Sequence, residues 1–401
     1  MDLKNKKMRT QTIILACTLL LVQHSFAQKS FEKIHQKAVF VDSHNDILTA
    51  VIEKKLQMDT DLKGKTHSDL ARFKAAHVDV QIFSVWCDGN EKDPLGLANR
   101  EMDTLDAVIK RNPEMIALVQ NNKELKRALK EKKLAAMFGV EGGHMINNDL
   151  NNLTKFRARG VRYMTLTWNN STSWATSAMD ETMKKDSLAK AHKGLTDFGK
   201  EVVMKMNELG IIVDLSHVGE QTFWDAINTT SKPVIVSHSN AYSLCPIFRN
   251  LKDDQIKSVA KNGGVIDLNF FSGFIDSSFL KKQTKFVLSH IRELDSLKKT
   301  GMVQEYAISI LSDKYAAEVY SNRPPMSALI DHLDYLVKLG GIDHVGIGSD
   351  FDGISSSPQE LDSVMDYPKI TKAMLERGYS KRDIYKVLGG NILRVLKANE
   401  Q

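Results

Sequence analysis

The 401-residue chain has few cysteines and only one long apolar run, at its N-terminus. Two of its three cysteines, Cys87 and Cys245, lie outside that run. Two cysteines do not define a disulfide framework, so one disulfide and two free thiols both stay open. No later segment has the roughly 20 apolar residues that a membrane-spanning helix needs, and we expect no transmembrane segment. The chain also lacks repeats, low-complexity tracts and a Pro/Gly linker.

The first 27 residues have the pattern of a secretory signal peptide. A basic segment precedes an apolar run at 13–22, and Ser25 and Ala27 form a small-x-small cleavage site. Cleavage after Ala27 would remove four basic residues and one acidic residue, which lowers the formal net charge from +6 to +3. The basic balance therefore mainly reflects targeting and predicts no nucleic-acid partner.

We accordingly expect an exported protein, periplasmic or secreted. Lipoprotein anchoring at Cys17 is disfavoured, because most of the apolar run follows that cysteine. The whole sequence is 42% apolar and 26% charged, a composition typical of soluble globular proteins, and we expect residues 28–401 to form the mature protein.

Short β-branched runs alternate with helical patterns along the chain. The runs lie at 38–42, 78–85, 134–140, 161–167, 211–215, 233–237, 264–269 and 344–348. Such alternation predicts a parallel sheet. Eight strands over about 310 residues favour one α/β domain, a (β/α)8 TIM-like barrel, over two smaller domains. An open doubly wound sheet is the alternative. The charged, helical stretch 276–324 is predicted to be an insertion on the rim.

Polar residues gather where the predicted strands end. They are His44, Asp46, Glu141, His144, Trp168, His217, His238, Asp350 and Asp352. Barrel enzymes build their sites from residues at C-terminal strand ends. A single histidine there is more often a hydrogen-bonding residue than a metal ligand, and Asp42 or Asp352 could cap a turn instead. Because the pattern recurs at five of eight ends, we interpret it as a metal site.

The spacing indicates how two divalent ions would be shared. His44 and Asp46 are two residues apart and lie on one face of an extended chain. His217 and His238 follow neighbouring strands and can share a second ion. Glu141 is the candidate bridge between two ions about 3.5–4 Å apart. Imidazole and carboxylate ligands suit Zn²⁺ and other first-row divalent ions, so two Zn²⁺ ions are favoured.

Longer stretches resemble the membrane (renal) dipeptidase family of zinc-dependent dipeptidases. They span about 34–399 and read DSHND, GVEGGHMI, GVRYMTLTWNNSTSWA, IIVDLSHVGEQTF, PVIVSHSNAYSLCPIFRN, DHLDYLVKLGGIDHVGIGSDFDGI and GGNILRVL. The resemblance implies a (β/α)8 barrel of the metal-dependent hydrolase type with two zinc ions. His44 and Asp46 match the ligands of one zinc. His217 and His238 match those of the other, and Glu141 matches the bridging carboxylate.

Three further positions take their roles from the resemblance. Asp350 matches the acid/base residue, and Arg249 matches the arginine that receives the substrate's C-terminal carboxylate. Family members have a histidine after TLT, where this chain has Trp168. We expect Trp168 to line the substrate pocket and to shape its specificity.

The resulting prediction is an exported dipeptidase that cleaves dipeptides with a metal-activated hydroxide, with a homodimer as one option for its assembly. Two alternatives stay open. One is a related barrel metal hydrolase that acts on acylated amino acids or lactones. The other is a peptide-binding protein that has lost turnover.

Overall fold

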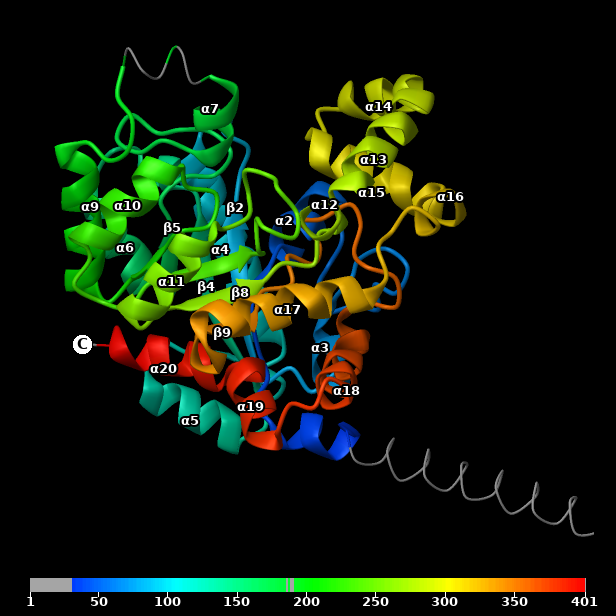
Figure 1. Ribbon diagram of the computed structural model, residues 1–401, viewed down its shortest axis with the longest axis horizontal. Helices are drawn as coiled ribbons and strands as arrows, with labels where there is room; N and C mark the ends of the chain where they lie inside the picture. Colours follow the sequence, from blue (N-terminus) through cyan, green and yellow to red (C-terminus); the bar gives the residue numbers. More distant parts are fainter. Residues whose placement is uncertain (1–30, 185–186, 188–190, 401) are drawn as a thin grey trace, which may run out of the picture.

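A nearly closed barrel of parallel strands forms the body of the computed structural model, which describes residues 31–184, 187 and 191–400 (Figure 1). The strands are β1 (Val41–Asn45), β2 (Val80–Trp86), β3 (Ile116–Leu118), β4 (Leu134–Glu141), β5 (Val161–Thr165), β6 (Ile212–Asp214), β7 (Ile235–Ser239), β8 (Val265–Leu268) and β9 (Val345–Ile347). The predicted signal peptide, 1–27, lies outside the described residues.

Eight strands pair in the order β1-β2-β4-β5-β6-β7-β8-β9, and every pairing is parallel. A parallel bridge between Asn45 and Phe351 brings the end of β1 against the segment that follows β9. The sheet therefore curls back on itself. This arrangement confirms the predicted (β/α)8 barrel and rules out the open doubly wound sheet.

The strand boundaries differ from the sequence prediction in two respects. The short β3 was missed, because three residues that pair only with β4 do not stand out as an apolar run. In addition, His44, Glu141 and His238 lie within β1, β4 and β7 rather than after them. Polar residues can continue a strand there because their side chains gather at the mouth of the barrel, while their backbones stay in the sheet.

Helices surround the barrel. They are α2 (Ile47–Glu53), α3 (Leu70–Ala75), α4 (Pro94–Arg111), α5 (Asn122–Lys130), α6 (Leu150–Ala158), α7 (Ala178–Met183), α9 (Asp197–Leu209), α10 (Glu220–Thr229), α11 (Asp253–Asn262), α12 (Ser272–Ile275), α17 (Met326–Gly340), α18 (Tyr367–Glu376), α19 (Lys381–Tyr385) and α20 (Asn391–Ala398). Local chemistry sets their ends. Thr196 caps α9 by accepting a hydrogen bond from the N–H of Gly199, and Gly210, with φ of 70°, ends that helix.

Four helices form a separate group that projects beside α12 (yellow in Figure 1). They are α13 (Ser277–Ser289), α14 (Ile291–Lys298), α15 (Gln304–Lys314) and α16 (Ala316–Tyr320), and we call them the rim helices. Phe286, Leu294 and Leu311 belong to a small apolar core of their own. The stretch 276–324 is thus helical, and its origin as an insertion stays a prediction.

The structure also bears on the state of the two cysteines and on the expectation of no transmembrane segment. Cys87 and Cys245 are both buried free thiols. Among the described residues, no helix is long and apolar enough to cross a membrane.

Candidate active site

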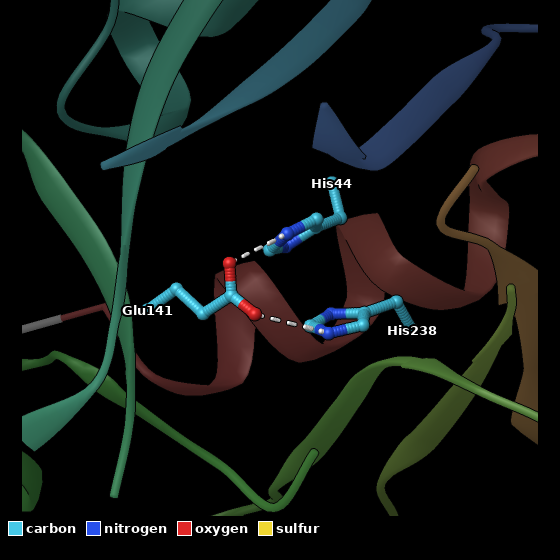
Figure 2. Close-up of side chains that lie close together, drawn as sticks. All are labelled: His44, Glu141 and His238. Carbon is cyan, nitrogen blue, oxygen red and sulfur yellow. Dashed lines mark ion pairs between the residues drawn. The ribbon is translucent and has the colours of Figure 1, made fainter. Parts of the chain in front are cut away.

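Three imidazoles and one carboxylate meet at the C-terminal mouth of the barrel. Figure 2 shows His44 and His238 pointing at opposite oxygens of Glu141. His44 Nε2 lies 3.2 Å from Glu141 Oε2. His217, which follows β6, places its Nε2 2.8 Å from Glu141 Oε1 and 2.9 Å from His238 Nε2. All four side chains are buried, so water solvates them poorly.

Two aspartates extend this cluster on the side of β1. Asp46 Oδ2 lies 3.4 Å from His44 Nε2. The potential ligand atoms of His44, Asp46 and Asp350 all lie within 4.8 Å of one another, and those of His44, Glu141 and His238 form a second such group. The structure therefore brings together all five predicted metal ligands and the predicted acid/base residue.

Gly353 allows the two aspartates to approach each other. A Cβ atom at this position would overlap with Asp46 Oδ2 and lie only 2.8 Å from Asp350 Oδ1. A side chain here would push at least one carboxylate away. Close packing of the two aspartates thus requires glycine at position 353, the last residue of the GSDFDG segment.

Asp350 is held by its backbone and by one side chain. Its N–H donates to the carbonyl of His44 at 3.0 Å, and its φ is 61°. Asn269 Nδ2 donates to Asp350 Oδ2 at 2.7 Å. Burial, reinforced by the charge of Asp46, raises the pKa of Asp350 well above its ordinary value. A carboxyl group so placed is suited to exchanging protons with a substrate.

The hydrogen-bond partners of the three histidines fix their tautomers. The Tyr163 hydroxyl donates to the carbonyl of Ser43, so its oxygen is free to accept from His44 Nδ1 at 2.7 Å. Asn169 Oδ1 can only accept, and it lies 3.1 Å from His217 Nδ1. In its neutral form, each of these rings therefore carries its proton on Nδ1, which leaves a lone pair on Nε2.

The third histidine, His238, has its Nδ1 fixed by two successive hydrogen bonds. The Ser237 hydroxyl donates to Asp214 Oδ2 at 2.7 Å, and its oxygen lies 2.8 Å from His238 Nδ1. His238 Nδ1 must then donate, and its Nε2 also carries a lone pair. Metal-binding histidines usually have this kind of partner on the second ring nitrogen.

The protonation of these residues shows whether they are suited to binding metal ions. The lone pairs of His217 and His238 face each other at 2.9 Å, and both face the Glu141 carboxylate. Burial lowers the pKa of His217 to about 4 and that of His238 well below its usual value, so both rings are neutral. Burial disfavours charge on Glu141, but the positive charge of His44 is the main effect that holds the pKa of Glu141 well below its usual value. The neutral imidazoles of His217 and His238 beside an ionised carboxylate form a donor set for divalent cations.

Arg249 is a buried cation beside this cluster. Its side chain makes one hydrogen bond, from Nη2 to the carbonyl of His238 at 3.2 Å, and its Nε has no partner. The guanidinium lies 5.1 Å from the centroid of the Phe274 ring. Burial lowers its pKa to about 10, which still leaves it charged at neutral pH. Among the described residues, no carboxylate forms an ion pair with it.

A cavity of about 270 Å³ connects the predicted site residues. The site residues on its wall are Asp46, Glu141, Trp168, His217, Arg249 and Asp350. Aromatic and aliphatic side chains make up much of the remaining wall, and the rim helices contribute Gln283, Glu305, Tyr306 and Ile308. The volume suits a small molecule rather than a polypeptide chain.

Trp168 lies where the sequence placed it, on the cavity wall beside His217. The two ring centroids are 6.3 Å apart. On its other side, Trp168 packs edge-on against Trp86 at 5.0 Å. The indole is thus part of the cavity and also part of an aromatic cluster.

Other polar residues at the strand ends have structural roles. Asp42 accepts hydrogen bonds from the Tyr367 hydroxyl and from the N–H and hydroxyl of Ser349. Asp352 accepts from the N–H of His67 and the hydroxyl of Ser68. His144 lies outside the cluster, with its Nε2 3.2 Å from Cys87 Sγ.

Sequence reasoning missed the residues that orient the histidines and those that the rim helices supply. Tyr163 and Ser237 lie within strands and read as ordinary strand residues. Glu305 and Tyr306 lie in a stretch read only as charged and helical. The one available signal was Asn169, which directly follows Trp168 at a strand end.

Comparison with known proteins identifies relatives over nearly the whole chain. The family model described as membrane dipeptidase (peptidase family M19) matches residues 28–401. An uncharacterized dipeptidase of Schizosaccharomyces pombe is 32% identical over 400 residues, covering 94% of this chain and 84% of the relative.

Solved structures show the same fold. The probable dipeptidase PvdM of Pseudomonas aeruginosa superposes with a TM-score of 0.76 at 23% identity, covering 94% of this chain and 98% of that one. A metallopeptidase of Rhodobacter sphaeroides, solved with a phosphinate mimic of the dipeptide L-Ala-D-Ala, gives a TM-score of 0.70 at 22% identity. That comparison covers 90% of this chain and 99% of the other.

Proposed function

The chain belongs to the membrane dipeptidase family and is a metal-dependent dipeptidase, and from this premise we propose that it is an exported enzyme with two divalent ions. Zn²⁺ is favoured, because imidazole nitrogen ligands suit it. His44 and Asp46 would hold one ion, and His217 and His238 the other. Glu141 would bridge them, since its two oxygens face different histidines.

One observation carries the choice of substrate. Arg249 is a buried guanidinium without a carboxylate partner among the described residues, and it opens onto the same small cavity as the metal cluster. A buried charge is costly unless it is paired. The terminal carboxylate of a dipeptide would supply the missing partner, and the cavity wall would exclude longer chains.

The chain's own residues divide the remaining work. Divalent ions, when bound, lower the pKa of water and polarise a carbonyl group. Arg249 would bind the terminal carboxylate through a two-pronged contact and fix the position of the scissile bond. Asp350 would accept the proton of the attacking water and deliver it to the leaving amine. Asn269, through its hydrogen bond, holds the Asp350 carboxyl in place for this transfer.

Export is supported by the sequence of residues 1–27, which has the order of basic, apolar and cleavage-site segments that signal peptides share. The test is expression of the full chain, followed by cell fractionation and N-terminal sequencing. A mature protein that begins at Gln28 in the periplasm or medium is expected. An uncleaved chain in the cytoplasm would contradict export without affecting the enzymatic proposal.

A substrate panel tests the activity. The purified mature protein, loaded with Zn²⁺, is assayed on L-L, L-D and D-D dipeptides, on N-acyl amino acids and on lactones, while elemental analysis counts the bound ions. We expect close to two ions per chain and hydrolysis of dipeptides. Hydrolysis confined to N-acyl amino acids or lactones would refute the dipeptide assignment, and failure to bind metal would refute the whole proposal.

A further inference from the structure

The rim helices supply part of the substrate cavity. Gln283 of α13 lines it, as do Glu305, Tyr306 and Ile308 of α15. Gln283 Nε2 donates to the hydroxyl of Ser355, another lining residue, at 2.7 Å, which ties α13 to the loop after β9. The rim helices therefore supply side chains to the cavity wall and influence which ligands the cavity can bind.

An aromatic wall runs from the metal cluster to these helices. It consists of Trp168, Trp86 and Tyr306. Trp86 packs edge-on against Trp168 at 5.0 Å and against Tyr306 at 6.3 Å. Tyr306 is buried, so its ring is held within this wall. Such a wall offers flat apolar surface to an alkyl or aromatic side chain and attracts cations to its faces.

Glu305 adds a carboxylate to this wall. It is half-buried and directly precedes Tyr306. In the described part of the chain, no other side chain forms an ion pair or hydrogen bond with it. Lys298 acts on its charge, but Lys298 Nζ donates to Gln304 at 2.9 Å. Burial, together with the negative charge of Asp88, raises the pKa of Glu305. A cation placed beside this carboxyl group would offset both effects.

Arg249 and the Glu305 carboxylate lie in different parts of the cavity. Arg249 Nη2 donates to the carbonyl of His238, whose ring faces Glu141 Oε1. Tyr306, next to Glu305, instead packs against Trp86 at the end of β2, the strand that pairs with β1. A dipeptide whose terminal carboxylate reaches Arg249 would cross the metal cluster. It would then place its N-terminal residue on the side of Trp86 and Tyr306.

We propose that the aromatic wall and Glu305 form a subsite for a basic N-terminal side chain. The preferred substrates are then dipeptides that begin with lysine, arginine or a similar residue with a long alkyl stem and a cationic head. The stem packs on the aromatic wall, and the head pairs with Glu305. This inference rests on the proposed dipeptidase function and adds a substrate class to it.

The test compares two nearly isosteric substrates. Values of kcat/KM are measured for Lys-Ala and norleucine-Ala, which differ in the terminal charge, and for Phe-Ala and Glu-Ala. A hydrogen bond to a charged group contributes about 1.5–3 kcal/mol, so we expect Lys-Ala to be preferred over norleucine-Ala about 10- to 100-fold. Glu305→Gln should remove most of that ratio, and Glu305→Lys should shift the preference to Glu-Ala.

Asp295→Asn is the matched control. Asp295 is an exposed carboxylate on α14 that does not line the cavity, so its loss changes the charge of the rim helices without touching the subsite. This variant should retain the Lys-Ala preference. Circular dichroism and thermal melting establish that each variant is folded.

The outcomes separate the two proposals. If neutral dipeptides are cleaved but the Lys-Ala preference is absent, or is unchanged in Glu305→Gln, the subsite is refuted and the dipeptidase function stands. A dominant, Glu305-independent preference for Phe-Ala would also refute it. Calorimetric binding of the same dipeptides is measured in parallel. Equal affinity for Lys-Ala and norleucine-Ala would refute the subsite even in a preparation without turnover.

Discussion

Replacing Arg249 with methionine tests the substrate assignment most directly. The guanidinium uses one N–H on the carbonyl of His238, and its Nε and remaining N–H groups can face the cavity. Two charge-assisted hydrogen bonds to a carboxylate contribute about 1.5–3 kcal/mol each. The variant should therefore lose about 3–6 kcal/mol of transition-state binding, or about 10²–10⁴-fold in kcat/KM at about 1.4 kcal/mol per factor of ten.

The assay uses each dipeptide and its C-terminal amide on wild type and on Arg249→Met. The amide has no carboxylate, so wild type should cleave it poorly, because the buried guanidinium then stays unpaired. In Arg249→Met the difference between acid and amide should largely vanish. The four rates form a cycle whose coupling energy isolates the contact between Arg249 and the carboxylate.

The reasoning would be refuted if wild type cleaved acids and amides equally well. It would also fail if the variant slowed both substrates by the same factor, since Arg249 would then support the site without touching the carboxylate. Arg292→Met is a useful control, because this arginine is exposed on α14 and its loss leaves the cavity unchanged.

Three further results are expected. Removal of the metal by a chelator should abolish hydrolysis, and zinc should restore it with close to two ions per chain by elemental analysis; activity in metal-free protein would contradict this. Asp350→Asn should retain both ions and substrate binding but lose about 10²-fold or more in turnover, and near-wild-type kcat would remove Asp350 from proton transfer. Gly353→Ala should cost about 1–3 kcal/mol of stability through overpacking and should weaken metal binding, because its Cβ overlaps with Asp46 Oδ2. Unchanged melting temperature and metal content would show that the loop after β9 can move aside.

The barrel and the meeting of the candidate metal ligands at its mouth could be predicted because both follow from short-range patterns. Parallel strands alternate with helices, and their C-terminal ends must meet at one mouth. Any His or Asp at such an end is therefore carried towards the others. This is why residues as distant in sequence as His44 and His238 could be assigned to one site. Their separation along the chain does not matter once the strand order is closed.

The partners of those ligands could not be predicted in the same way. Tyr163 reaches His44 across 119 positions, and nothing in a strand sequence indicates which ring nitrogen its hydroxyl will meet. The same holds for Asp214, which reaches His238 Nδ1 through the hydroxyl of Ser237. Protonation of each histidine depends on side-chain geometry, which periodicity and spacing do not encode.

Two departures that looked separate in the sequence prove to be connected in the structure. Trp168 stands where the resemblance to the family predicts a histidine, and the rim helices occupy the stretch 276–324. Trp86 joins them, since it packs against Trp168 on one side and against Tyr306 of α15 on the other. An indole cannot become positively charged, so Trp168 cannot replace a protonated imidazole beside a developing oxyanion. It can, however, extend apolar surface from His217 to the rim helices. We therefore expect the exchange of histidine for tryptophan to remove an ionisable group beside the proposed metal site and to add a wall shared with the rim helices, so that this position would contribute to substrate selection instead of charge stabilisation.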